Sequence, residues 1–294
     1  MKSLGRLLTA MVTPFKSDGS VDVNEACRIA EHLIETGHDG VVVSGTTGES
    51  PALETDEKLA LFTAIKKRLG NAGTVIAGTG GNNTRHSVEL TKRAAQTGVD
   101  AVLAVVPYYN KPTQDGLLEH FGAIAAADPI PVVMYNVPGR TSQNMTASTT
   151  HELARRHRNI VGIKESTGNV EQHAHLVADN PRPDEFSVWS GDDYFFLPAL
   201  ALGAYGLVSV AGHIVGRRLR ALIDAYDQGN MPAAGALHRE LQPLFSALFA
   251  TTNPIPVKWA VNRMGFAAGA CRSPLGDMPA ELALTLEPLI APYI

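Results

Sequence analysis

Short apolar runs rich in β-branched residues alternate along most of the chain with longer segments of helical periodicity. Eight runs have the length and composition of buried strands, at 7–12, 40–44, 74–78, 101–106, 131–135, 160–164, 186–190 and 206–210. Strands that are apolar throughout and alternate with helices are typical of a parallel sheet covered by helices on its faces. Eight such units predict an α/β fold, the closed (β/α)8 or TIM barrel.

A doubly wound open sheet is the alternative to a barrel. Such sheets usually carry a phosphate-binding glycine signature directly after the first strand. Here the first run continues into Thr13-Pro14-Phe15, and the glycine-rich segment 78–83 lacks the third glycine of the dinucleotide fingerprint. The barrel is therefore the favoured fold.

One helix is marked clearly at both ends. It is predicted to begin with Thr55 as N-cap and to end at Gly70, with an apolar face made of Leu59, Phe62, Ile65 and Leu69. A second helix is expected from about residue 84 to about residue 98.

After the eighth run the pattern becomes purely helical. Leu237, Leu241, Leu244 and Leu248 share one helical face, and further helices are expected over 256–264 and 279–290. We therefore predict a catalytic barrel over 1–225 and a C-terminal helical region over 226–294 that packs on the barrel.

Composition narrows the class of protein. The 294 residues are 45% hydrophobic and 18% charged, with a net charge of −4, so nothing indicates binding to nucleic acid or to an anionic membrane. No segment is long and apolar enough to span a bilayer. Two distant cysteines, Cys27 and Cys271, form neither a disulfide framework nor a zinc site, and Cys27 is expected to be buried. These features predict a cytoplasmic globular protein.

In a (β/α)8 barrel the catalytic residues follow the strands at their C-terminal ends. The segments that meet at this rim are 45–50, 107–110, 135–141, Lys164, 190–193 and 209–212. Hydroxyl groups, tyrosines, one arginine and one lysine are therefore expected to converge there.

Lys164 ends the sixth apolar run and is expected to be buried. A buried ammonium loses hydration, which favours the neutral amine, a nucleophile that can form a Schiff base with a carbonyl substrate. Two alternatives remain at this point: a lysine that reaches solvent, or a structural ion pair with Glu165.

The other rim residues each have a chemical role available. The turn with Thr46 and Thr47 presents backbone N–H groups and hydroxyls that suit a small carboxylate. Tyr135 could pass protons near Lys164, and Arg140 could bind a second carboxylate. An ordinary turn, a rim tyrosine and a surface arginine are the simpler explanations.

Two further features concern subunit contacts and metals. Tyr108 and Tyr109 are adjacent, so one is expected to point inward and the other outward, toward solvent or a neighbouring subunit. His173 and His175 are two apart on a predicted helix and face different directions. The ten histidines otherwise scatter and are interpreted as surface residues, so no metal site is expected.

Several motifs together resemble the dihydrodipicolinate synthase family of pyruvate-dependent class I aldolases. They are Gly-Thr-Thr-Gly-Glu-Ser at 45–50, Tyr-Asn-Val-Pro-Gly-Arg-Thr at 135–141, Gly-Ile-Lys-Glu at 162–165, Ser-Gly-Asp-Asp at 190–193 and Asn-Pro-Ile-Pro-Val-Lys at 253–258. They occur in the family's order, and the resemblance covers essentially the whole chain.

The resemblance implies a mechanism. Lys164 condenses with pyruvate to an imine and then an enamine, which attacks the aldehyde of aspartate 4-semialdehyde. Tyr135 shuttles protons, and Thr46 links it to Tyr109 of the partner subunit. The substrate-binding groups that the resemblance implies are Thr46 and Thr47 for the pyruvate carboxylate, Arg140 for the semialdehyde carboxylate, and Gly191 and Val208 beside the imine.

The resemblance also implies a homotetramer, a dimer of tight dimers, with no metal or organic cofactor. Sialic acid lyases and sugar-acid aldolases share the lysine and the tyrosine, and they are the alternative. Because both Thr47 and Arg140 are present, the synthase is favoured. A keto-acid-binding protein without activity is disfavoured, since the lysine, tyrosines and threonines are retained together.

Many members of the family are inhibited by lysine at the dimer interface. At the corresponding positions Ser50, Asn82 and Tyr108 match the sensitive members, whereas Thr55 and Lys58 replace histidines and His86 replaces a glutamate. A carboxylate that would face the ligand's ammonium has become an imidazole, and a cation has been added. Lysine inhibition is therefore expected to be weak or absent.

Overall fold

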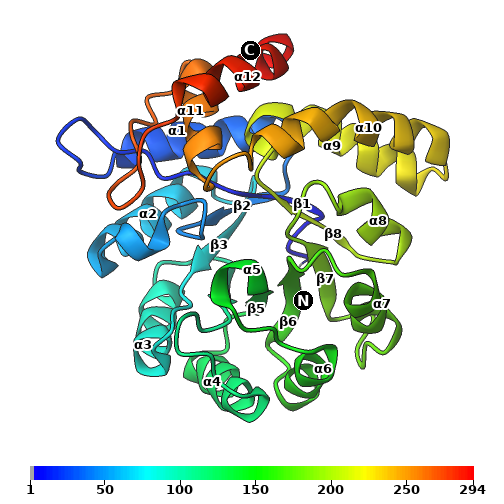
Figure 1. Cartoon of the computed structure of the whole chain (residues 1–294). Coiled ribbons are helices and arrows are strands. Elements are labelled where there is room, and N and C mark those ends of the chain that lie inside the picture. The colour runs from blue at the N-terminus through cyan, green and yellow to red at the C-terminus, as the bar shows by residue number, and fades with distance from the viewer. Residues whose placement is uncertain (1–2) are drawn as a thin grey trace. The chain divides into compact units, whose positions relative to one another are not determined.

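The eight predicted strands are all present. The structure is a computed structural model that describes residues 3–294. Its strands follow one another around a closed barrel in chain order, which confirms the predicted (β/α)8 fold. They are β1 (Leu7–Ala10), β2 (Gly40–Val43), β3 (Thr74–Gly78), β4 (Ala101–Val105), β5 (Val132–Asn136), β6 (Ile160–Glu165), β7 (Ser187–Ser190) and β8 (Gly206–Ser209) (Figure 1).

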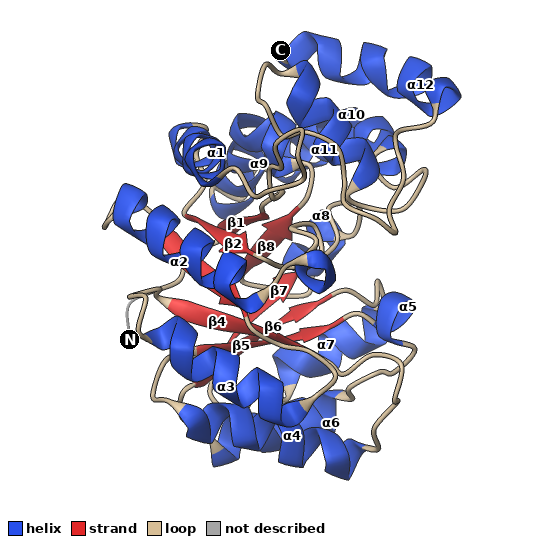
Figure 2. Cartoon of the chain, turned by 90° about the vertical axis from the view of Figure 1, so that its left-hand side faces the viewer, coloured by secondary structure: helices blue, strands red, loops and turns tan. Residues whose placement is uncertain are grey.

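Helices follow the strands along the chain (Figure 2). They are α1 (Val23–Glu35), α2 (Thr55–Leu69), α3 (Thr84–Ala95), α4 (Gln114–Ala127), α5 (Pro138–Thr141), α6 (Ala147–Arg156), α7 (Val170–Ala178), α8 (Phe196–Ala201) and α9 (Gly212–Asp227), with the short 3-10 turn η1 (Ser50–Ala52) before α2. The C-terminal helices are α10 (Met231–Ala247), α11 (Ile255–Arg263) and α12 (Ala280–Ile290), followed by η2 (Ala291–Tyr293). No helix within residues 3–294 is long and apolar enough to cross a membrane.

The described chain forms two compact units. One contains Val75–Val208 with the N-terminal residues up to Arg6, and the other contains Leu7–Thr74 with Ser209–Ile294. In the first unit α4 packs against α3 and α6, and in the second α10 packs against α9 and α12. The boundary between residues 225 and 226 stays a prediction.

The first strand is shorter than its apolar run. The prediction extended to Val12, but β1 ends at Ala10. The backbone N–H of Val12 donates to the His213 ring Nε2 at 3.1 Å rather than to a neighbouring strand. A side chain from the start of α9 therefore ends the strand.

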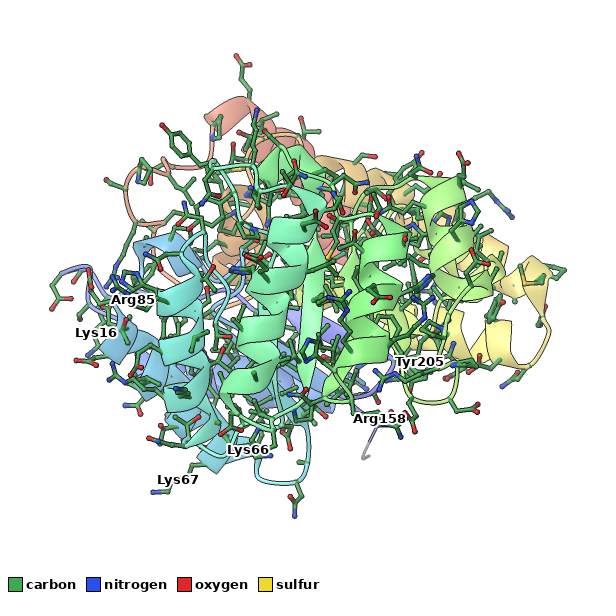
Figure 3. The ribbon with its side chains drawn as sticks, turned by 90° about the horizontal axis from the view of Figure 1, so that it is seen from below. Lys16, Lys66, Lys67, Arg85, Arg158 and Tyr205 are labelled. Atoms are coloured by element: carbon green, nitrogen blue, oxygen red, sulfur yellow. The ribbon has the colours of Figure 1, made fainter. Side chains whose placement is uncertain are left out.

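Helix α2 begins one residue away from the predicted cap. Glu54 is the N-cap, and its backbone N–H donates to Glu57 Oε2 at 2.9 Å as one half of a capping box, so Thr55 is the first helical residue. Leu61 is buried in place of Leu59. In the last turn Lys67 projects away from the ribbon (Figure 3), where its charge is favourable at a helix C-terminus.

The prediction that the histidines are surface residues holds for His86 and His175, which are exposed, but is wrong for many of the others. The side chains of several are buried: His38, His120, His151, His173, His213 and His238. His213 explains how this is possible. Its Nδ1–H donates to the Val210 carbonyl at 2.8 Å, and its Nε2 accepts from Val12, so a neutral ring satisfies both nitrogens. Burial lowers the pKa of His213 to about 4.

This histidine predicts how stability depends on pH. The unfolded chain binds the His213 proton below pH 6.5, whereas the folded chain binds it only below about pH 4. Stability should therefore fall as the pH falls from 6.5 to 4. In His213→Asn, which cannot titrate, the slope of the unfolding free energy against pH should decrease by up to about 1.4 kcal/mol per pH unit. Urea unfolding at several pH values measures it.

His175→Asn is the matched control, because His175 is exposed on α7. The decrease in slope should be larger for His213→Asn than for His175→Asn, because the His213 ring is buried. Equal slopes for His213→Asn and the unchanged chain would contradict the prediction.

Candidate active site

Lys164 lies in β6, one residue before the end of the strand, and is only 4% exposed. It is in register with Tyr135 of β5. The Lys164 Nζ atom lies 4.3 Å from the centroid of the Tyr135 ring. The prediction that Lys164 is buried is confirmed, and the alternative in which it reaches solvent is wrong.

Glu165 does not form the ion pair that was the other alternative for Lys164. Its carboxylate is fully buried and accepts from Asn136 Nδ2 at 3.0 Å, Gln172 Nε2 at 2.8 Å and the Thr167 N–H at 2.8 Å. Successive residues of a strand point to opposite faces, so Glu165 is directed away from its neighbour. The carboxylate is satisfied without a cation, and it fixes the end of β6.

Gly191 follows β7 and lies directly beside the lysine. Its N–H donates to the Glu165 carbonyl at 2.8 Å. A Cβ atom placed on Gly191 would lie 2.6 Å from Lys164 Cε and 2.0 Å from Ser166 Oγ. Only a residue without a side chain leaves room for the lysine in this position.

Because of this contact, we expect Gly191→Ala to slow the formation of an adduct on Lys164. The added methyl group overlaps Lys164 Cε, so the side chain must leave its position. If Lys164 is the nucleophile that the sequence predicts, this displacement costs on the order of 10²-fold in rate. Borohydride trapping of the adduct expected with pyruvate measures this loss. Gly139→Ala is the control, since a Cβ at Gly139 meets nothing within 4 Å. An unchanged trapping rate for Gly191→Ala would refute the prediction.

The other predicted site residues of the compact unit that contains Val75–Val208 lie on several elements. Arg140 is exposed on α5, and Val208 is 1% exposed in β8. Tyr108 is half-buried, whereas Tyr109 is 90% exposed. The adjacent tyrosines therefore differ in burial, as the sequence predicted.

Thr46 and Thr47 belong to the other compact unit, in the turn after β2. The Glu49 N–H donates to the Thr46 carbonyl at 3.1 Å, and the Ser50 N–H donates to the Gly45 carbonyl at 3.2 Å. Within residues 3–294, the backbone N–H groups of Thr46 and Thr47 donate to no other group. The turn thus presents two backbone donors and two hydroxyls, the groups that bind a carboxylate.

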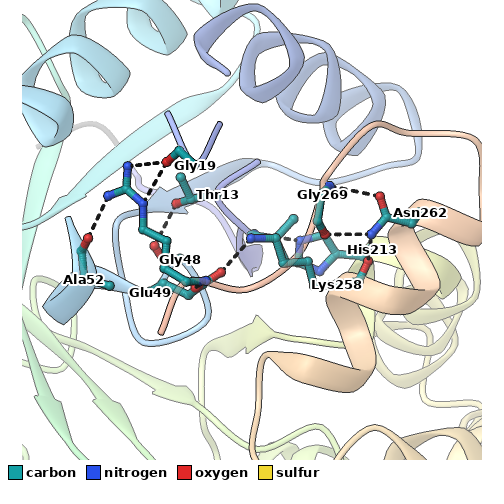
Figure 4. Close-up of polar contacts among 11 residues, drawn as sticks. Thr13, Gly19, Gly48, Glu49, Ala52, His213, Lys258, Asn262 and Gly269 are labelled. Carbon is teal, nitrogen blue, oxygen red and sulfur yellow. Dashed lines mark hydrogen bonds and ion pairs between the residues drawn. The ribbon is translucent and has the colours of Figure 1, made fainter. Parts of the chain in front are cut away.

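The turn is held by buried side chains. Glu49 adopts a left-handed φ of 55°, and its carboxylate accepts from Lys258 Nζ at 2.7 Å and from the Arg272 N–H at 2.8 Å. The side chains of Glu49 and Lys258 are each 1% exposed, and Figure 4 shows the ion pair between them. Thr13 Oγ1 donates to the Gly48 carbonyl at 2.7 Å, and Asn253 Nδ2 donates to Thr47 Oγ1 at 3.0 Å.

Sequence reasoning gave no role to Glu49, Asn253 or Lys258. The motif 253–258 was recognised only as a shared sequence. Within this motif Asn253 and Lys258 stand among proline and aliphatic residues, and this was the available signal, because a buried polar or charged group needs a partner.

The six residues at the predicted regulatory positions are divided between the units. Ser50, Thr55 and Lys58 lie in η1 and α2, and Asn82, His86 and Tyr108 lie at or near α3 and after β4. His86 and Thr55 are exposed. Lys58 is partly buried, and this burial lowers its pKa. In the part of the chain that the structure describes, no three His, Cys, Asp or Glu residues form a group that could hold a metal.

A closed (β/α)8 barrel with a buried lysine near the end of its sixth strand, beside a tyrosine of the fifth, has the groups that a lyase forming a Schiff base with its substrate requires. The chain belongs to the dihydrodipicolinate synthetase family, whose model matches residues 3–291. It is 49% identical to the 4-hydroxy-tetrahydrodipicolinate synthase of Dehalococcoides mccartyi, over all of this chain and 98% of that one.

Solved structures agree with this assignment. The crystal structure of dihydrodipicolinate synthase from Bacillus anthracis matches with a TM-score of 0.96 and 42% identity over 99% of each chain. The enzyme from Cyanidioschyzon merolae, solved with lysine bound, matches with a TM-score of 0.95 and 44% identity over 98% of this chain and 97% of that one.

Proposed function

We propose that this protein is a 4-hydroxy-tetrahydrodipicolinate synthase, which condenses pyruvate with L-aspartate 4-semialdehyde in lysine and diaminopimelate biosynthesis. The observation that carries the proposal is the buried Lys164 beside Tyr135 and Gly191. Family membership and relatives that bear this name over the full chain support it.

Lys164 would supply the covalent step. Its amine attacks the ketone carbon of pyruvate, and loss of water gives an imine. Loss of a methyl proton then gives an enamine, whose carbon attacks the aldehyde of the semialdehyde. The amino group of that substrate closes the ring on the imine carbon, and the lysine leaves. Tyr135 would carry protons in these steps, since its ring lies against the amine.

The carboxylates of the two substrates would be bound by Thr46, Thr47 and Arg140. Thr46 and Thr47 offer unused backbone donors for the carboxylate of pyruvate. Arg140, exposed after β5, would bind the carboxylate of the semialdehyde. Gly191 and Val208 would contribute backbone groups beside the imine.

Tyr109 would act in a neighbouring subunit. It is 90% exposed and adopts a left-handed φ of 72°, a conformation that costs free energy in a residue other than glycine. A backbone held in this way to expose an aromatic ring suits an intersubunit contact. We therefore propose a homotetramer, a dimer of dimers, in which Tyr109 belongs to the partner's proton relay.

The remaining parts of the proposal concern cofactor, location and domains. Because Lys164 activates the ketone covalently, the reaction needs neither a metal nor an organic cofactor. We expect a cytoplasmic enzyme, with a barrel over 1–225 and a helical region over 226–294.

A coupled assay tests the proposed function. Pyruvate and aspartate 4-semialdehyde are mixed with the protein and with the reductase that consumes the product, and NADPH oxidation is followed. Turnover is the expected result. If there is no turnover but borohydride traps pyruvate on Lys164, the protein is instead an aldolase for another aldehyde, and a protein that forms no adduct is a binding protein.

Lysine inhibition is expected to be weak or absent. Lys58 and His86 stand where sensitive relatives have a histidine and a glutamate, so a cationic ligand loses an attractive carboxylate and meets an added positive charge. The initial rate measured with L-lysine up to the millimolar range should change less than twofold. Half-maximal inhibition at micromolar lysine would refute this expectation. D-lysine is the control for effects of ionic strength.

A further inference from the structure

Asn253 lies between α10 and α11 and is 4% exposed. Its Nδ2 group donates to Thr47 Oγ1 at 3.0 Å, although the two residues are 206 positions apart in the sequence. Both belong to the compact unit formed by Leu7–Thr74 and Ser209–Ile294. The C-terminal helical segment thus touches a hydroxyl of the carboxylate-binding turn.

This contact fixes the direction of the Thr47 proton. A hydroxyl has one proton and two lone pairs. Because the amide of Asn253 donates to the oxygen, the proton of Thr47 must point elsewhere. Within residues 3–294 it has no acceptor. The hydroxyl is therefore preset as a donor, and a carboxylate, which only accepts, is its natural partner.

The backbone under Thr47 is restrained as well. Two residues further on, Glu49 is left-handed and its buried carboxylate is bound to Lys258 and to the Arg272 N–H. These partners also come from the C-terminal segment. The backbone of the turn is therefore held in place, so the Thr47 hydroxyl cannot move to form a hydrogen bond with a different group.

We propose that Asn253 is a positioning residue that holds the Thr47 hydroxyl as a donor and so selects a 2-keto acid over the neutral ketone of the same shape. The inference rests on the proposed function, in which Thr46 and Thr47 bind the carboxylate of pyruvate. Asn253 acts through Thr47 and does not touch the reacting atoms.

The test compares pyruvate with its neutral amide, pyruvamide, in the full chain. The rate of borohydride-trapped adduct formation on Lys164 is measured at low concentration of each ketone. In Asn253→Asp the new carboxylate accepts the Thr47 proton and repels the substrate's charge. The preference for pyruvate over pyruvamide should fall about 10- to 100-fold, with a raised KM for pyruvate and a much smaller change in kcat.

Asn262→Asp is the matched control. Asn262 lies in α11 and donates to the carbonyls of Lys258 and Gly269, at 3.0 and 2.9 Å, and it does not contact Thr47. The Asn262→Asp variant should have a lower melting temperature and an unchanged preference for pyruvate over pyruvamide. Asn253→Ala, which removes the donor without adding charge, should lower the ratio by a smaller factor, and it serves if Asn253→Asp does not fold.

The outcomes separate the two proposals. If the unsubstituted protein forms the pyruvate adduct and the Asn253 variant has the same preference for pyruvate over pyruvamide, only the positioning role of Asn253 is overturned. An equal fall of the ratio in Asn262→Asp also overturns it, because the effect would then be structural. A chain that forms no adduct with pyruvate overturns the proposed function and this inference together.

Discussion

Lys164→Met is expected to abolish turnover while the fold is retained. Methionine keeps an unbranched apolar stem in the 4% exposed position beside Tyr135, so packing changes little. The amine is lost, and with it the covalent step that activates the ketone under the proposed function. The rate in the coupled assay should fall by roughly 10⁴-fold or more, and borohydride with labelled pyruvate should leave no label on the chain.

The control is Lys67→Met, at an exposed lysine in the last turn of α2 that projects from the ribbon in Figure 3. It should keep both turnover and labelling. Labelling that persists in Lys164→Met would place the Schiff base on another lysine. Lys258, the other buried lysine among residues 3–294, would then be examined first, since it is 1% exposed.

Lys258→Met is expected to lower the free energy of unfolding by about 3–5 kcal/mol, because it leaves the buried Glu49 carboxylate without its cation. The Arg272 N–H also donates to that carboxylate, at 2.8 Å, but it carries no charge. Burial lowers the pKa of Lys258 and the nearby Glu49 opposes this. Urea unfolding at one fixed protein concentration, followed by tryptophan fluorescence, measures the loss.

The double variant Glu49→Gln/Lys258→Met separates the lost ion pair from lost packing. Replacing both charges leaves neither one buried alone, so the double variant should be more stable than Lys258→Met by about 2 kcal/mol or more. If the effects of the two single changes simply add, the prediction is contradicted. Because Glu49 belongs to the turn of Thr46 and Thr47, both single variants should also raise the KM for pyruvate.

Local patterns in the sequence were sufficient to predict the barrel and the residues that lie at the C-terminal ends of its strands. The run at 160–164 predicted β6 within one residue, and the run at 131–135 predicted β5 within one residue at each end. Parallel strands carry their C-terminal residues to one edge, so Lys164 and Tyr135 were expected at the same rim. Their register in adjacent strands confirms it.

Local patterns could not give the partners of buried polar groups. Alternation along β6 separates Lys164 from Glu165, but only the packed structure shows that Asn136, Gln172 and the Thr167 N–H satisfy the carboxylate. The buried histidines were misassigned for the same reason. A histidine such as His213 is tolerated inside when a carbonyl and an N–H are placed at its two nitrogens.

The sequence by itself determined the fold class and which residues follow the strands at the rim, because periodicity and strand ends are properties of neighbouring residues. Only the tertiary structure decided which distant side chains hold the rim residues in place. Asn253 reaches Thr47 across 206 positions and Lys258 reaches Glu49 across 209. No local pattern records such pairs, since chain folding alone brings them together, and the cost of an unpaired buried charge or amide then requires that they meet.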